Sequence, residues 1–327
     1  MSKRSIVTLL LFGTLASGSL HAQNTLFFLE LQAVGAYSTE ARAFELFSLM
    51  PEDVMQKPSV GFDFVERLSG RSRDIGVLAV QARLAYDQEG GHKFQPQLYN
   101  AYLRLKAGFA DFWAGHARPA LGLSYGLDSH ALLLPAPAML GYGFDRDWGV
   151  GLHRDFSWGD AAVSLTTGSG MPLYFRANYL AAARVSNGVL ARDNYNFGLS
   201  LAHGDILETT GYELVEPDPL SWSSASIDAS YLWRNLENRA ELLIGRRDGD
   251  GIFLLFWRSG LAMLDEARLK IEVQPVLMSR GGDWVYSLGS GLTYLFNADL
   301  AGRFMVIYDR GRRDARFVLQ FYYYKRL

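Results

Sequence analysis

Apolar and polar residues alternate along most of this chain, and this alternation limits the possible fold more than any other feature of the sequence. Near the start, Phe27, Leu29 and Leu31 occupy every second position, and Glu30 and Gln32 lie between them. A period of two places apolar side chains on one face of a β-strand and polar side chains on the other. From residue 23 onward no run approaches the ~20 apolar residues that a membrane-spanning helix needs. The sequence therefore predicts an all-β fold of amphipathic strands.

The length of these strands separates two all-β architectures. Many of them run for roughly 9 to 12 residues, whereas strands of soluble proteins are typically ~5–6 residues long. Tilted strands of about 9–11 residues cross a bilayer. Several apolar faces end in an aromatic residue, as at Tyr37, Tyr99 and Trp233, which is typical of the aromatic girdles of membrane barrels. Because only a closed barrel pairs every strand in lipid, the sequence predicts a transmembrane antiparallel β-barrel.

The alternating segments number sixteen, and bacterial single-chain barrels have an even number of strands. The predicted strands are 25–37, 60–69, 75–87, 96–107, 110–118, 147–156, 160–168, 178–186, 193–203, 223–233, 237–247, 251–260, 266–277, 284–296, 298–308 and 315–325. The alternation is least clear in 60–69 and 178–186, and without this pair fourteen strands remain.

The connections between these strands fall into two groups. If both ends of the barrel sequence are periplasmic, the short connections share the periplasmic side. The long connections, 38–59, 119–146 and 204–222, then lie on the extracellular side. Short periplasmic turns and long extracellular loops are expected of such barrels. The segment 119–146 becomes a long third extracellular loop.

The N-terminal segment has the features of an export signal. Lys3 and Arg4 give it a positive start, residues 6–15 are almost wholly apolar, and small residues precede Ala22. A run of about ten apolar residues suits a secretory signal peptide and is too short for a spanning anchor. We expect residues 1–22 to be the signal peptide and 23–327 to be the barrel, in the bacterial outer membrane.

The composition argues against several other classes of protein. A formal net charge of −2 does not suit a generally basic nucleic-acid binder, so no nucleic-acid partner is expected. The chain has no Cys, and its His residues are too dispersed for a typical metal site, so we expect no metal and no cofactor. We also expect no enzymatic activity. An outer-membrane lipase or deacylase is the enzymatic alternative, since barrel enzymes keep few local signatures.

One part of the chain, residues 96–170, resembles a known family. It contains Tyr102-Leu103-Arg104-Leu105, Trp113-Ala114-Gly115-His116-Ala117-Arg118-Pro119, Asp145-Arg146-Asp147-Trp148-Gly149-Val150-Gly151-Leu152 and Thr167-Gly168-Ser169-Gly170. This pattern is similar to that of the phosphate-selective porin O and P family. The resemblance implies a sixteen-stranded, trimeric porin whose third loop folds into the lumen. Between Ala120 and Phe144, however, there is no Lys or Arg, so the resemblance does not extend to phosphate selectivity.

The charged residues lie almost exclusively on the polar faces of the predicted strands. A charge on the lipid side costs roughly 2–4 kcal/mol near the bilayer midplane, so this placement predicts a wet interior. The third loop adds two polar candidates. We expect the following residues to line the pore: Arg83, Arg104, Lys106, Asp111, Asp128, His130, Arg239, Glu241, Arg268, Lys270, Glu272 and Arg303. A slight excess of basic residues predicts a mild anion preference. Individually, they can also form cross-strand pairs such as Arg239 with Glu241 or Lys270 with Glu272.

Two functions are consistent with such a barrel. The first is a porin-like channel for passive diffusion of small hydrophilic or anionic solutes, embedded in outer-membrane lipids and, by the family resemblance, trimeric. The second is a plugged structural barrel that acts as a scaffold or binds a protein partner in an envelope assembly. The apolar segment 131–142 motivates the second function, because it could fill the lumen or dock a partner.

Overall fold

The computed structural model describes residues 24–46, 56–70, 73–88, 93–128, 130, 132–311 and 313–327. The expected signal peptide, residues 1–22, lies outside the described residues. No helix within the described ranges has both the length and the apolar character needed to span a membrane.

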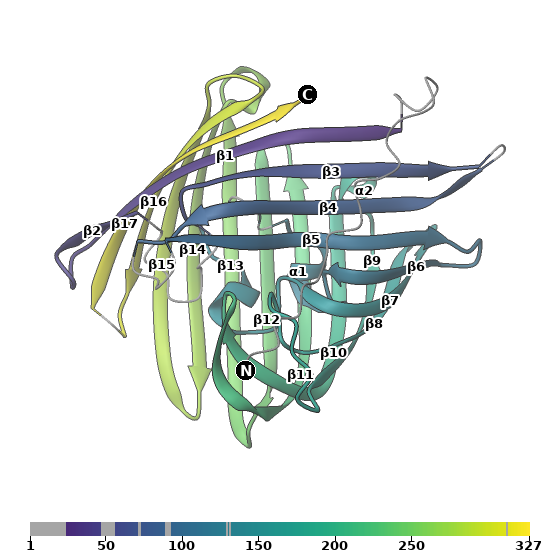
Figure 1. The fold of residues 1–327 in the computed structure, drawn as a ribbon. Coiled ribbons are helices and arrows are strands. Elements are labelled where there is room, and N and C mark those ends of the chain that lie inside the picture. Colours follow the sequence, from purple (N-terminus) through teal and green to yellow (C-terminus); the bar gives the residue numbers. More distant parts are fainter. Residues whose placement is uncertain are drawn as a thin grey trace, which may run out of the picture.

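Sixteen long strands of the described chain form one closed antiparallel barrel (Figure 1). They are β1 (Thr25–Ser38), β3 (Ser59–Ser69), β4 (Asp74–Tyr86), β5 (Phe94–Lys106), β6 (Asp111–Ala117), β7 (Asp147–Phe156), β8 (Gly159–Thr166), β9 (Tyr179–Asn187), β10 (Tyr195–Thr210), β11 (Glu213–Trp233), β12 (Leu236–Arg247), β13 (Asp250–Met263), β14 (Leu269–Arg280), β15 (Asp283–Leu295), β16 (Leu300–Asp309) and β17 (Asp314–Arg326). The barrel closes because β1 pairs with β17 on one side and with β3 on the other. The short strand β2 (Ala43–Glu45) pairs antiparallel with the end of β1. The predicted sixteen-stranded barrel is confirmed, including 60–69 and 178–186.

The alternating residues of the strands point to opposite faces of the barrel wall, as predicted. In β1, Leu31 and Tyr37 are exposed on the outer face, whereas Glu30 and Gln32 are buried inside. In β9, exposed and buried residues alternate at every position. Outward apolar and inward polar side chains are the arrangement that a barrel in lipid requires.

The predicted loop at 204–222 is wrong, because the two strands continue through it. β10 runs to Thr210, and β11 begins at Glu213, so a tight turn joins them. Asp205, Glu208, Pro217 and Pro219 interrupt the apolar alternation there. Beyond the bilayer, the outer face of a strand meets water and needs no apolar residues. A sequence pattern based on lipid-facing residues therefore ends where the membrane ends, although the strands do not.

Tyr99 does not belong to the outer aromatic girdle, where the sequence placed it. The register between β4 and β5 shifts beside it, from Gln81 opposite Asn100 to Ala82 opposite Leu98. Tyr99 is 3% exposed, and its hydroxyl donates a hydrogen bond to Asp145 at 2.7 Å. A β-bulge adds one residue to a strand and so reorients the side chains beside it.

The third loop, residues 118–146, folds into the barrel and carries two short helices, α1 (Gly122–Gly126) and η1 (Pro137–Leu140). Its apolar side chains pack against apolar residues of the inner wall. One cluster joins Leu121, Leu123 and Tyr142 to β9–β14, and the other joins Leu133 and Leu134 to β1, β16 and β17.

Strand β13 shows the effect of this loop on the barrel wall. Its inward residues Ile252, Leu254 and Phe256 are buried, and its outward residues Leu255 and Trp257 are exposed. The strand is therefore apolar on both faces, because lipid meets one face and the third loop covers the other. The two remaining short helices, α2 (Leu190–Asp193) and η2 (Asp265–Ala267), lie in the connections before β10 and β14.

Candidate functional site

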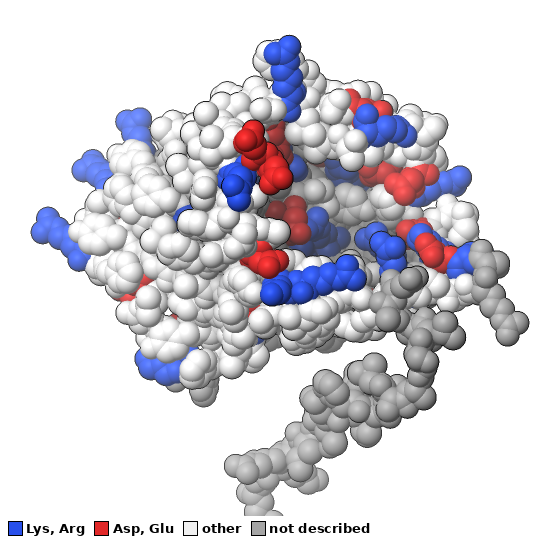
Figure 2. All heavy atoms as spheres, turned by 90° about the horizontal axis from the view of Figure 1, so that it is seen from above, with Lys and Arg blue, Asp and Glu red and all other residues white. Residues whose placement is uncertain are grey.

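The candidate site is the barrel interior, and the third loop divides it. Figure 2 shows a hollow with acidic and basic side chains around and inside it. The first part of the loop is held by side chains of the wall. The Ala120 N–H donates to Ser164 Oγ and the Gly122 N–H to Ser200 Oγ, both at 3.0 Å. The Leu123 N–H donates to Glu241 Oε2 at 3.1 Å.

These contacts explain Glu241, one of the predicted pore-lining residues. It is 2% exposed, because the loop covers it. Gly122 adopts a φ of +50°, and a Cβ at this position would collide with the Glu241 carboxylate. Glycine is therefore required where the loop approaches the wall. Within the interior, Glu241 acts as an anchor for the loop.

The middle of the loop is fixed to β13 by Arg258. Its Nη2 donates to the carbonyl oxygens of Leu134 and Pro135 at 2.8 and 3.1 Å. Gln274 donates to the same Pro135 oxygen at 2.9 Å. Beside them, a Cβ on Gly289 would come within 2.7 Å of Leu134, so this glycine makes room for the leucine. Sequence reasoning missed Arg258, although a basic residue directly after an apolar run is a visible signal.

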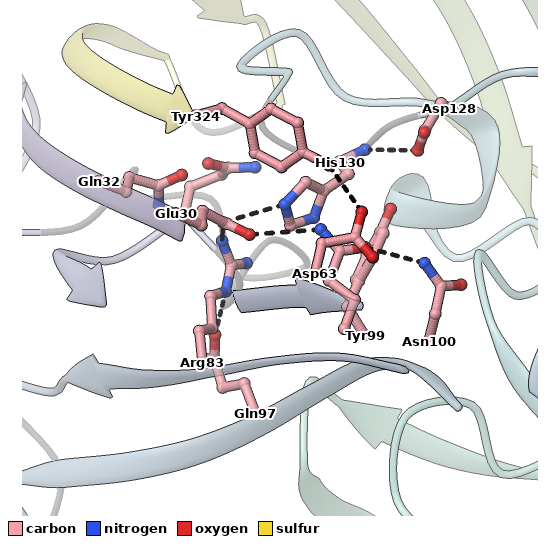
Figure 3. Close-up of polar contacts among 12 residues, drawn as sticks. Glu30, Gln32, Asp63, Arg83, Gln97, Tyr99, Asn100, Asp128, His130 and Tyr324 are labelled. Atoms are coloured by element: carbon pink, nitrogen blue, oxygen red, sulfur yellow. Dashed lines mark hydrogen bonds and ion pairs between the residues drawn. The ribbon is translucent and has the colours of Figure 1, made fainter. Parts of the chain in front are cut away.

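The loop also reaches β1 through His130. His130 Nε2 lies 3.0 Å from Glu30 Oε1, and Arg83 Nη1 donates to the same oxygen at 3.2 Å. Gln81 donates to the other Glu30 oxygen at 3.3 Å. Figure 3 shows His130 and Arg83 directed at Glu30. The side chains of Glu30 and Arg83 are each 1% exposed. The predicted residues Arg83 and His130 therefore meet in one buried cluster.

Asp128 lies on the exposed edge of the loop. Its side chain is 66% exposed, and it pairs with Arg118 at 2.8 Å and Arg146 at 3.5 Å. Burial raises the pKa of this carboxyl, but the two guanidinium groups lower it more, so the pKa lies below 3.8. Figure 3 shows Asp63 and Asp128 on two sides of His130. Asp63 accepts a hydrogen bond from the Tyr324 hydroxyl at 2.7 Å.

Four further charged residues form a network across β12, β13 and β14. Lys270 lies 2.9 Å from Glu237 and 3.0 Å from Glu272, and Arg239 pairs with Glu237. Lys270 reaches past β13 because Gly260 faces it there, and a Cβ on Gly260 would lie 2.7 Å from Lys270 Cε. The expected pair Lys270–Glu272 is present, whereas Arg239 pairs with Glu237 in place of Glu241.

The remaining predicted residues are less buried. Arg104 lies over the Tyr102 ring at 5.8 Å, and Asp111 is half-buried. Lys106 is half-exposed and lies 3.5 Å from Asp74. Arg303 and Arg268, the last two predicted residues, lie in different parts of the barrel. Arg303 donates to Gln320 at 2.8 Å inside the barrel, whereas Arg268 is exposed in the turn before β14.

The end of the β10–β11 hairpin leaves the wall and reaches β5, which is not adjacent to either strand of the hairpin. The Tyr212 hydroxyl donates to the Leu98 carbonyl at 2.8 Å, although β5 pairs only with β4 and β6. Register shifts on both sides of Glu208 mark where the hairpin bends. The Thr209 hydroxyl donates to the Ser169 carbonyl at 3.0 Å. The hairpin therefore crosses one end of the barrel, and sequence reasoning missed it.

Across the described ranges, no three His, Asp or Glu side chains are arranged to hold a metal ion. The arrangement is instead one of paired charges, half-exposed polar groups and two segments that fold over the lumen.

Solved structures similar to this barrel were found, whereas sequence comparison found no similar protein. No protein-family model matches the chain, and no curated protein matches it. An anion-selective porin from Comamonas acidovorans is similar with a TM-score of 0.64 and 11% identity, over 92% of this chain and 99% of that one. OmpF of Salmonella typhi, in a complex with daunomycin, gives 0.66 and 12%, over 92% and 98%. A loop-deletion mutant of OmpT, an outer membrane protein of Vibrio cholerae, gives 0.63 and 12%, over 92% and 99%. The chain therefore has the fold of the bacterial outer-membrane porins.

Proposed function

We propose that this protein is a channel in the bacterial outer membrane for passive diffusion of small hydrophilic solutes, and that it catalyses no reaction. The observation that carries the proposal is the position of the third loop. Its apolar side chains pack against β1 and β9–β17, while Asp63, Asn100 and Arg104 on β3–β5 are only partly buried. Polar groups that stay accessible beside an infolded loop are what a water-filled pore needs.

We further propose that small anions are mildly preferred. Most interior charges are paired and so largely cancel. Within the described ranges, Arg104 and Arg303 have no carboxylate at ion-pair distance, and each lies over a tyrosine ring. Unbalanced charges in a pore select ions by sign. These two arginines support the anion preference.

The plugged scaffold is the second function, and for it the apolar segment 131–142 has either to fill the lumen or to dock a partner. Leu133, Leu134 and Tyr142 are between 3% and 8% exposed and pack inside their own barrel. This burial argues against docking through these side chains and agrees with a loop that fills part of the lumen. If the segment plugs the lumen, deletion of residues 131–142 should raise conductance sharply.

Single-channel recording of the refolded chain in a planar bilayer tests the proposal. We expect stable open steps and, under a salt gradient, a reversal potential that shows slight anion preference. A homotrimer, which the family resemblance implies, would give steps in groups of three. Absence of current from a protein whose folded state is verified by its heat-dependent shift in gel mobility would contradict the channel function.

A further inference from the structure

Two arginines of the inner wall converge on one carboxylate where the hairpin bends. Glu208 of β10 lies 2.9 Å from Arg247 Nη2 of β12 and 3.6 Å from Arg280 Nη1 of β14. Since β13 separates β12 from β14, the three charges meet across the surface of the wall. Arg247 and Arg280 are the last residues of their strands, so the cluster lies at the rim of the barrel.

The charges of this cluster do not balance. Arg280, Glu208 and the Tyr142 phenol of the third loop lie near Arg247. The strand register also places Asp250 opposite Arg247 and Asp283 opposite Arg280. Tyr142 donates its hydroxyl proton to the Ser279 carbonyl at 3.1 Å. Among the described residues, Glu208 is the carboxylate that lies at ion-pair distance from these two guanidinium groups, so two guanidinium groups share one direct carboxylate partner.

The donors of the two arginines are also not all used. Arg247 is 8% exposed, and its Nε has no hydrogen-bond partner among the described residues. The Arg280 side chain is 49% exposed and so can meet a solute from the water. A guanidinium group presents five N–H donors, and carboxylates bind it through two oxygens. The pair therefore has both the charge and the free donors for a second carboxylate.

We propose that Arg247 and Arg280 form a binding site for the carboxylate group of small organic acids, and that Glu208 occupies this site in the absence of such a solute. This inference rests on the proposed channel function, because the site lies at one entrance to the lumen. Glu208 competes with the solute as a tethered carboxylate. Its displacement also releases one of the contacts that hold the hairpin over the barrel.

The test is calorimetric titration of the full-length, detergent-refolded protein with glutarate, a dicarboxylate with the same carboxylate group as Glu208. If the tethered carboxylate fills the site about nine-tenths of the time, Glu208→Gln binds glutarate about tenfold more tightly than wild type. Arg280→Gln, at a half-exposed position, is expected to lose binding without loss of the fold. Arg247→Gln is expected to lose binding as well, but Arg247 is buried, so this substitution also perturbs the folded barrel more than Arg280→Gln does.

Two controls make the result specific. Glu213→Gln removes an exposed acid from the same hairpin and should leave glutarate binding unchanged. Neutral glutaramide should not bind. Equal glutarate affinity in wild type and Glu208→Gln, or undiminished affinity in Arg280→Gln, would overturn the inference. Because binding is measured without current, a protein that conducts but does not bind glutarate refutes only this site, and one that binds but does not conduct refutes only the channel.

Discussion

Leu134 is the apolar side chain through which we expect the third loop to be held most firmly, and its truncation gives a quantitative prediction. It is 3% exposed and packs against the inner wall beside Gly289 and Gly291. Leu134→Ala removes three buried carbon atoms, at about 0.8 kcal/mol for each, so loop docking loses about 2.4 kcal/mol. Such a loss raises the population of the detached loop about fiftyfold. The cavity left behind adds to this cost.

Single-channel recording measures this population, because a detached loop no longer narrows the lumen. We expect Leu134→Ala to visit a state of higher conductance far more often than wild type. Leu132→Ala is the matched control, since Leu132 lies in the same segment but is only partly buried, and its effect should be much smaller. If Leu134→Ala keeps the folded barrel and shows unchanged current fluctuations, or if Leu132→Ala matches it, the reasoning about loop docking is refuted.

Three further predictions concern the charges and the hairpin. Arg104→Gln and Lys106→Gln should each shift the reversal potential toward cations, and a shift toward anions would contradict their assignment to the pore. Asp128→Asn should shift it toward anions at neutral pH. Because the folded pKa of Asp128 lies below 3.8, its stabilisation of the loop is complete above that value and is lost as the pH falls through the folded pKa. The difference between wild type and Asp128→Asn should therefore disappear only in that acidic range, as a pH series of reversal potentials would show. Deletion of residues 209–216 should raise conductance by clearing the end of the barrel, and an unchanged conductance would show that the hairpin does not restrict the current.

The strand order was predictable because lipid imposes one rule on every strand. Outward residues must be apolar, so period-two alternation marks each crossing. Once the strands were located, the lengths of the connections between them identified the third loop, because short turns and long loops lie on opposite sides of the membrane. The rule failed for Tyr99, because a tyrosine is acceptable on either face and the bulge beside it has no local signal. It failed for the β10–β11 hairpin because strands outside the bilayer do not follow it.

The contacts of the interior were less predictable than the fold. His130 and Glu30 are 100 residues apart, and no local pattern identifies such a pair. Lys270 reaches Glu237 only because Gly260 lies between them, which requires knowledge of the register. The apolar inner face of β13 did leave a signal, since residues 252–257 are all apolar. Such a run in an alternating barrel indicates that another segment covers the inner face.

The burial of the third loop against one part of the wall divides the barrel into regions with different tolerance to mutation. Inward positions on β9–β14 must fit the loop, so a change at Leu243 or Phe256 is constrained as in a soluble protein core. Inward positions on β3–β5 that do not hold the loop should vary without loss of the fold. Arg104, which lies over the Tyr102 ring, is one of them, whereas Asn100 accepts a hydrogen bond from Arg146 of the loop at 2.8 Å. Libraries that aim to change which solutes pass should therefore be confined to such positions on β3–β5. Natural variation among relatives of this chain should be distributed in the same way. Inward residues of β9–β14 should change little, and new solute specificities should arise from inward residues of β3–β5.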